Sequence, residues 1–221
     1  MENRVIDPEC RDRDQTPGEE LANSISHGLA FLAAAIAAPF LLHHAARTGT
    51  TASIVGASIF VAAIAFLYLA STLYHALPHG KLKQVFRVIE HMAIFILIAG
   101  TYTPFTLSVL RGPWGWTLFG LIWALALSGL LLKAIGRTRY PMLSTSLYLM
   151  MGWVVLVAIQ PLWHRMPHRG LFWIFLGGLA YTGGVVFYAY DYRLRYSHFV
   201  WHLFVIVGTV CHFAAVFGYA V

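Results

Sequence analysis

Seven long apolar stretches constrain the fold of this chain more than any other feature. Each is about 20 residues long, the length that a helix needs to cross the hydrocarbon core of a bilayer. The stretches cover approximately 24–45, 52–76, 88–110, 114–134, 142–161, 171–190 and 198–220. Short connections with turn residues, such as Pro78-His79-Gly80, separate them. The pattern predicts an all-α, polytopic membrane protein that folds as a bundle of seven transmembrane helices.

The distribution of charge supports a membrane protein and separates a short N-terminal tail from the rest. Charged residues make up 11% of the 221 residues, against roughly 25% in a typical soluble domain. Seven of the nine acidic residues lie before residue 21, and only Glu90 and Asp191 lie beyond it. We therefore expect a solvated tail over residues 1–22 and a seven-helix transmembrane domain over residues 23–221.

Lysine and arginine residues indicate how the chain is oriented, because they favour the cytoplasmic side of a membrane. Eleven lie on the side of the N-terminal tail: Arg4, Arg11, Arg13, Lys81, Lys83, Arg87, Lys133, Arg137, Arg139, Arg193 and Arg195. Four lie on the other side: Arg47, Arg111, Arg165 and Arg169. The count predicts a cytoplasmic N-terminus in a multi-pass protein of the inner (plasma) membrane. The net charge of +6 then reflects contact with lipid headgroups, and it does not indicate nucleic acid as a partner.

Three histidines at the ends of two apolar stretches form a candidate metal site. His198 and His202 are four residues apart, so both imidazoles lie on one face of a helix. His75 closes the stretch 52–76, and Glu90 lies at the start of the next stretch. In the predicted topology all four side chains fall at the cytoplasmic ends of their helices, so they can meet at one depth. Polar groups inside a membrane are costly and usually functional, and this set therefore predicts a metal site.

The composition of this set indicates zinc and a hydrolytic role. Three neutral imidazoles, here His75, His198 and His202, suit a zinc ion and leave a fourth position for water, as in catalytic zinc sites. Zinc lowers the pKa of such a water towards roughly 7. We expect Glu90 to hold this water and accept its proton. We expect Ser71, one turn before His75, to hydrogen-bond the water or a developing oxyanion.

Simpler interpretations of the same residues stay open. A single pair of histidines at this spacing is a weak signal, and histidines at helix ends often lie in the interfacial region. Glu90 could pair with Arg87, which lies one turn before it. His27 and His91 are within reach of the site and are expected to be structural or to support the ligands from outside. His212 lies ten residues beyond the last candidate ligand, about 15 Å along a helix, and is expected to hydrogen-bond a neighbouring helix instead.

Five segments of the chain carry a resemblance to a known family. They are Glu20-x-x-Asn23-x-x-x-His27-Gly28, Ser71-x-x-Tyr74-His75, the run from Ala93 to Phe105, Gly112-Pro113-Trp114-Gly115-Trp116, and His198-x-x-x-His202 followed by His212-Phe213. Over residues 19–220 the chain resembles the hemolysin III family, the bacterial branch of the progestin and adipoQ receptor proteins. The resemblance implies a seven-helix bundle with its N-terminus inside, and a zinc ion bound by His75, His198 and His202.

The resemblance also implies a chemistry. The wider superfamily includes alkaline ceramidases and adiponectin receptors, for which the implied reaction is the hydrolysis of lipid amides. In those proteins an aspartate that opens the third helix positions the zinc-bound water. Glu90 stands at that place in this sequence, and it keeps the charge while adding one methylene. The family name itself records haemolysis.

Two functions of different classes follow from the sequence. The first is a zinc-dependent hydrolase of a lipid amide or ester bond, with Glu90 and Ser71 as catalytic residues and membrane lipids as substrates. The alternative is a non-enzymatic sensor or regulator of membrane state, or a cytolytic protein, in which zinc only braces the helices. A haem protein, with imidazoles ligating iron, is a third and weaker option.

Overall fold

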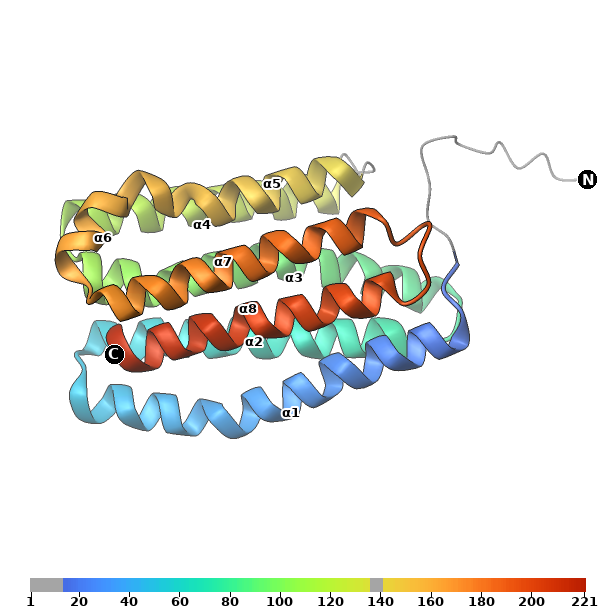
Figure 1. Ribbon diagram of the computed structural model, residues 1–221, viewed down its shortest axis with the longest axis horizontal. Helices are drawn as coiled ribbons and strands as arrows, with labels where there is room; N and C mark the ends of the chain where they lie inside the picture. Colours follow the sequence, from blue (N-terminus) through green and yellow to red (C-terminus); the bar gives the residue numbers. More distant parts are fainter. Residues whose placement is uncertain (1–13, 136–140) are drawn as a thin grey trace, which may run out of the picture.

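The structure, a computed structural model, describes residues 14–135 and 141–221, and its regular elements within these ranges are all helical (Figure 1). Seven helical segments among these residues are long and apolar enough to cross a bilayer. They are Pro17–Thr48, Thr51–Ala76, Lys81–Leu110, Pro113–Ala134, Met142–Arg165, His168–Ala189 and Ser197–Tyr219. The predicted fold class, an all-α membrane protein with seven transmembrane helices, is confirmed.

Two of the seven spans change their helix type along the way. The elements follow one another as α1 (Pro17–Thr48), α2 (Thr51–Ala76), α3 (Lys81–Pro104), the π-helix η1 (Phe105–Leu110), α4 (Pro113–Ala134), α5 (Pro141–Trp153), the 3-10 helix η2 (Val154–Ala158), α6 (Ile159–Arg165), α7 (His168–Ala189) and α8 (Ser197–Tyr219). Pro104 marks the change from α3 to η1, because proline has no N–H to continue the α-helical pattern.

Helix α1 begins at Pro17, earlier than the apolar pattern predicts, because local polar signals start it. Thr16 and Glu19 form a capping box: the Glu19 N–H donates to Thr16 Oγ1 at 3.3 Å, and the Thr16 N–H donates to a Glu19 carboxylate oxygen at 2.9 Å. Pro17 follows the cap, a position at which a missing N–H is tolerated. As a result Glu19 and Glu20 lie on the first turn of a helix.

The helices pack mainly against their neighbours in the sequence, and α8 lies beside both α7 and α1 (Figure 1). Gly100 of α3 permits a close approach to α2, since a Cβ atom there would lie 2.6 Å from that of Ala63. Buried aromatic residues such as Phe60 and Phe95 fill the space between the helices. The outer face of α1 is apolar and exposed, with Ile36 68% exposed, as contact with lipid requires.

One end of the bundle gathers the segments that carry the candidate site. Helices α1, α3 and α8 begin there and α2 ends there, at the right in Figure 1. We call this the histidine end, and the end formed by η1, α6 and the last turns of α8 the opposite end. This arrangement places the end of α2 and the first turns of α3 and α8 at one depth, as the predicted topology requires.

Candidate metal centre

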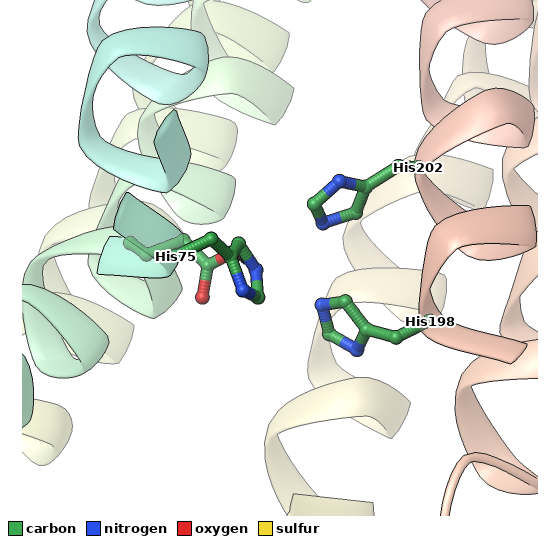
Figure 2. A group of neighbouring side chains, drawn as sticks. His75, His198 and His202 are labelled. Carbon is green, nitrogen blue, oxygen red and sulfur yellow. Dashed lines mark ion pairs between the residues drawn. The ribbon is translucent and has the colours of Figure 1, made fainter. Parts of the chain in front are cut away.

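The five predicted site residues come together at the histidine end, four of them as potential metal ligands. One ligand atom from each of His75, Glu90, His198 and His202 lies within 4.8 Å of the other three. Figure 2 shows His75 facing the two histidines of α8 across the space between the helices. Because these residues belong to α2, α3 and α8, only the folded bundle brings them together. The cluster could hold a metal ion.

The start of α8 is held in place by residues from two other helices. Tyr196, just before α8, has a left-handed backbone with a φ of 58°. Its N–H donates to Glu19 Oε1 of α1 at 2.7 Å. The Ser197 hydroxyl donates to the Phe187 carbonyl of α7 at 2.7 Å. These bonds fix the direction in which α8 leaves the loop, and hence where its first histidine points.

The three histidines each present a buried ring nitrogen that the protein does not satisfy. His202 is fully buried, and His75 and His198 are 4% and 9% exposed. Within the described ranges, the Nε2 atoms of all three rings are buried and have no hydrogen-bond partner. Buried polar atoms in folded proteins are almost always paired. Three such nitrogens in one small space are what a metal ion needs as ligands.

The other ring nitrogens carry the hydrogens. His75 Nδ1 lies 2.7 Å from Glu20 Oε2, and His198 Nδ1 lies 3.2 Å from Asp191 Oδ2. Since a carboxylate only accepts, each Nδ1 donates its hydrogen and each Nε2 keeps its lone pair.

His202 reaches the same tautomer through a hydroxyl group. Ser26 donates its hydroxyl hydrogen to the Asn23 carbonyl at 2.8 Å, while the same oxygen lies 3.1 Å from His202 Nδ1. Because the hydrogen of Ser26 is already used, its oxygen accepts the Nδ1–H of His202. All three rings therefore turn an Nε2 lone pair into the cluster, as metal-binding histidines with outer hydrogen-bond partners do.

Charge also fits a cation. Three carboxylates contact the histidines, those of Glu20, Glu90 and Asp191. One ammonium group, Lys83 Nζ, lies 2.9 Å from Glu20 Oε1. When ionised, these four side chains carry a net charge of −2, which a divalent cation would balance. An excess of carboxylates around buried histidines favours a bound cation, so the donor set and the charge point to the same kind of ligand.

Ser71 and Glu90 lie beside the histidines as a hydrogen-bonded pair. The Ser71 hydroxyl donates to Glu90 Oε1 at 3.0 Å, and the same oxygen lies 3.8 Å from His75 Nε2. The other carboxylate oxygen of Glu90 lies 3.6 Å from His91 Nδ1. His91 Nδ1 in turn donates to the Arg87 carbonyl at 2.6 Å. Glu90 is thus directed into the cluster by Ser71.

The remaining buried histidines take different places. His27 stacks on His202 with 3.6 Å between ring centroids and 5° between planes. Neither nitrogen of His27 has a partner among the described residues, but this ring is outside the group of potential ligands. His212 Nδ1 donates to the Gly208 carbonyl of its own helix at 2.8 Å. The expected hydrogen bond from His212 to a neighbouring helix is therefore wrong for this nitrogen; Tyr181 of the neighbouring helix α7 stacks on the ring instead.

Sequence reasoning identified the cluster but not its outer partners. Glu20, Ser26, Lys83 and Asp191 were not predicted as parts of the site. The sequence does hold one signal for Glu20: a threonine followed three residues later by glutamate marks the start of a helix. Recognising that cap at Thr16 would have placed Glu20 on the first turn of a helix, at the same end of the bundle as the cluster.

A seven-helix membrane bundle with a histidine and glutamate cluster at one end defines the class of this protein. The chain belongs to the haemolysin-III related family, whose model matches residues 16–213. The resemblance read from the sequence is therefore confirmed.

Individual relatives cover nearly the whole chain. Hemolysin-3 of Bacillus cereus is 40% identical over 201 residues, 91% of each chain. The hemolysin-3 homolog of Bacillus subtilis (strain 168) is 41% identical over 203 residues, 92% of this chain and 95% of its own. The human monocyte to macrophage differentiation factor is 26% identical over 206 residues, 91% of this chain and 84% of its own. No solved structure gives a significant match.

Proposed function

We propose that this protein is an integral membrane hydrolase that binds zinc and cleaves an amide or ester bond of a lipid. The observation that carries the proposal is the convergence of three bare Nε2 atoms beside the hydrogen-bonded pair of Ser71 and Glu90. Three histidine nitrogens with one position left open are the ligand set of catalytic zinc sites. The residues that would hold the ion are His75, His198 and His202.

When bound, zinc supplies Lewis-acid activation of water and of a carbonyl group. Glu90 is placed to accept a proton at Oε1 or Oε2, because its carboxylate lies against the ring of His75. Ser71 keeps that carboxylate aimed into the cluster through its hydroxyl hydrogen bond. A general base of this kind contributes about 10²- to 10⁴-fold to the rate of a proton-transfer step.

The depth of the site supports a lipid as the substrate. The cluster lies in the last turn of α2 and the first turns of α8, close to where a spanning helix meets the headgroup region. The ester and amide linkages of membrane lipids lie at that boundary, between the headgroup and the acyl chains. Basic residues concentrate on the same side, and we propose that this side is cytoplasmic, in a multi-pass protein of the plasma membrane.

A second function is favoured by one specific observation. The carboxylate of Glu90 belongs to the same group of ligand atoms within 4.8 Å as the three histidines. As a fourth ligand Glu90 would close the site, and closed four-ligand zinc sites are structural. The protein would then be a non-enzymatic sensor or regulator of the membrane, or a cytolytic protein, as the name hemolysin-3 records for its relatives.

The Glu90→Gln variant separates the two functions. Wild type and variant are purified in detergent, their zinc content is measured by elemental analysis, and each is incubated with a mixed lipid extract for product analysis by mass spectrometry. The hydrolase predicts one zinc per chain in both proteins, with product from the wild type and a loss of about 10²-fold or more in the variant. The closed site predicts a large loss of zinc in the variant and no product from either protein.

His79→Asn, in the turn between α2 and α3, is the matched control and should keep both zinc and turnover. A zinc-loaded wild type that releases no product from any lipid fraction would overturn the hydrolase. Visible absorption of the same preparation tests the haem option directly.

A further inference from the structure

We propose that Lys83, Glu20 and His75 form a positioning triad. The triad fixes the tautomer and orientation of one ligand of the cluster, His75, before a divalent cation binds. Glu20 and Lys83 contact none of the reacting atoms, so they are positioning residues and not catalytic ones. The inference uses the ability of the cluster to hold a cation and is independent of whether the protein hydrolyses a lipid.

Glu20 is fixed through both of its carboxylate oxygens. Oε2 accepts from His75 Nδ1 at 2.7 Å, and Oε1 accepts from Lys83 Nζ at 2.9 Å. The side chains are 15%, 1% and 9% exposed for Glu20, His75 and Lys83, so water competes little for these bonds. Hydrogen bonds with a charged partner are short and roughly twice as strong as neutral ones. The carboxylate therefore has one position and one orientation.

Lys83 ties together three helices at this point. Besides Glu20 of α1, its ammonium group donates to the Tyr74 and Leu77 carbonyls at 3.0 and 3.1 Å. Lys83 itself belongs to the first turn of α3. An ammonium group has three N–H donors, and here all three have acceptors. The two carbonyls belong to the C-terminal end of α2, where a cation is favoured, so Lys83 also holds the turn that carries His75.

The triad distinguishes His75 from the other two candidate ligands. His198 has its carboxylate partner, Asp191, at 3.2 Å, and the Asp191 side chain is 24% exposed. His202 has the neutral hydroxyl of Ser26 as its partner. Of the three histidines, only His75 has a charged partner at a short distance that is itself held by a buried cation. Outer partners of this kind fix the tautomer of a metal-binding histidine and raise its basicity, and their loss lowers metal affinity about 10- to 100-fold.

The test measures zinc affinity and the His75 tautomer in separate experiments. Zinc affinity of purified protein is measured by competition with a chelator. The tautomer is measured on metal-free protein by ¹⁵N nuclear magnetic resonance of labelled histidine side chains. Glu20→Gln keeps an acceptor but removes the charge, and Glu20→Leu removes both. Lys83→Met removes the cation and keeps most of the side-chain volume.

Glu20→Gln is expected to keep the Nδ1–H tautomer of His75 and to lower zinc affinity about tenfold. Glu20→Leu is expected to lower it about a hundredfold and to give a mixture of His75 tautomers. Lys83→Met should fall between the wild type and Glu20→Gln. Lys81→Met is the matched control for Lys83→Met, because Lys81 is an exposed lysine on the same turn of α3; it should keep the affinity and the tautomer.

Wild-type affinity in Glu20→Gln together with an unchanged His75 tautomer in Glu20→Leu would overturn the triad. If Glu20→Leu does not fold, the conservative Glu20→Gln variant decides through its affinity alone. A failure of this inference leaves lipid hydrolysis untouched, since turnover is measured separately. Conversely, a graded loss of zinc affinity without any lipid product supports the triad and removes the hydrolase.

Discussion

The two ends of the bundle each bury a histidine of α8, but in the part of the chain that the structure describes only the histidine end forms a cluster of potential metal ligands. His202 at the histidine end has an Nε2 atom without a partner, and its ring lies 5.0 Å from that of His75. His212 lies towards the opposite end, bonded to Gly208 and stacked on Tyr181 with 5.5 Å between ring centroids. It lines a mostly apolar cavity of about 50 Å³. Burial of a histidine therefore does not mark a metal site.

The site is distinguished by histidine Nε2 atoms that have no hydrogen-bond partner among the described residues and that face one another from separate helices. At the histidine end the outer nitrogens of His75, His198 and His202 are bound to acceptors, so the inner ones are directed at a common point. Towards the opposite end, His212 is held by its own helix. The comparison predicts that changes to the ligands and their hydrogen-bond partners at the histidine end affect metal binding, and that changes around His212 affect only stability.

Replacing His202 and His212 of α8 in turn gives the largest expected contrast. His202→Ala removes a ligand. Its loss of zinc affinity should therefore exceed the loss of about 100-fold that follows when a hydrogen-bond partner of a ligand is removed. His212→Ala should keep one zinc per chain. Elemental analysis after dialysis against a chelator measures both. Equal zinc loss in the two variants would mean that metal binding depends on the integrity of α8 as a whole, which contradicts the comparison.

Two buried hydroxyl groups allow a finer version of the same test. Ser26→Ala leaves the Nδ1–H of His202 without its acceptor, at a cost of about 1–3 kcal/mol and about tenfold in zinc affinity. Thr209→Val removes the partner of the Tyr181 hydroxyl, which lies at 2.9 Å, at a similar cost in stability. Thermal unfolding in detergent and chelator competition measure the two quantities. If Thr209→Val also weakens zinc binding tenfold, stability and not position controls the site.

The parts of the site that the sequence predicted are those that depend on depth alone. His75, Glu90, His198 and His202 meet because helix ends alternate between the two sides of a membrane, and apolar length locates those ends. Ser71 follows from helical spacing, since it lies one turn before His75. Depth and spacing are properties of single helices, and a sequence shows them directly.

The parts that the sequence missed depend on which helices lie side by side. Glu20 reaches His75 from α1, and Ser26 reaches His202 from the same helix. Asp191 reaches His198 from the loop before α8. Hydropathy locates each helix along the membrane normal but carries no information about its lateral neighbours. The contact of α1 with both α2 and α8 supplied Glu20 and Ser26. Glu20 was also missed because the apolar pattern placed the start of α1 too late.

Alanine substitutions at two glycines should have the smallest effect on zinc affinity and a clear effect on helix packing. A Cβ atom at Gly177 of α7 would lie 2.4 Å from the His212 ring and 3.1 Å from the Gly208 carbonyl. Because that ring is bonded to Gly208, it cannot easily move, and Gly177→Ala should cost about 1–3 kcal/mol by overpacking. At Gly28 of α1 the nearest atom is Thr72 Cγ2 at 3.5 Å, an ordinary contact.

Gly28→Ala should therefore be neutral or stabilise the protein by up to about 1 kcal/mol, because alanine favours a helix. Neither change should alter zinc affinity, although Gly28 lies next to His27 at the histidine end. Thermal unfolding of the two variants, with zinc affinity measured on the same samples, checks this. A loss of affinity in Gly177→Ala would show that strain at the opposite end reaches the cluster through α8, and the two ends would then have to be treated as one coupled unit.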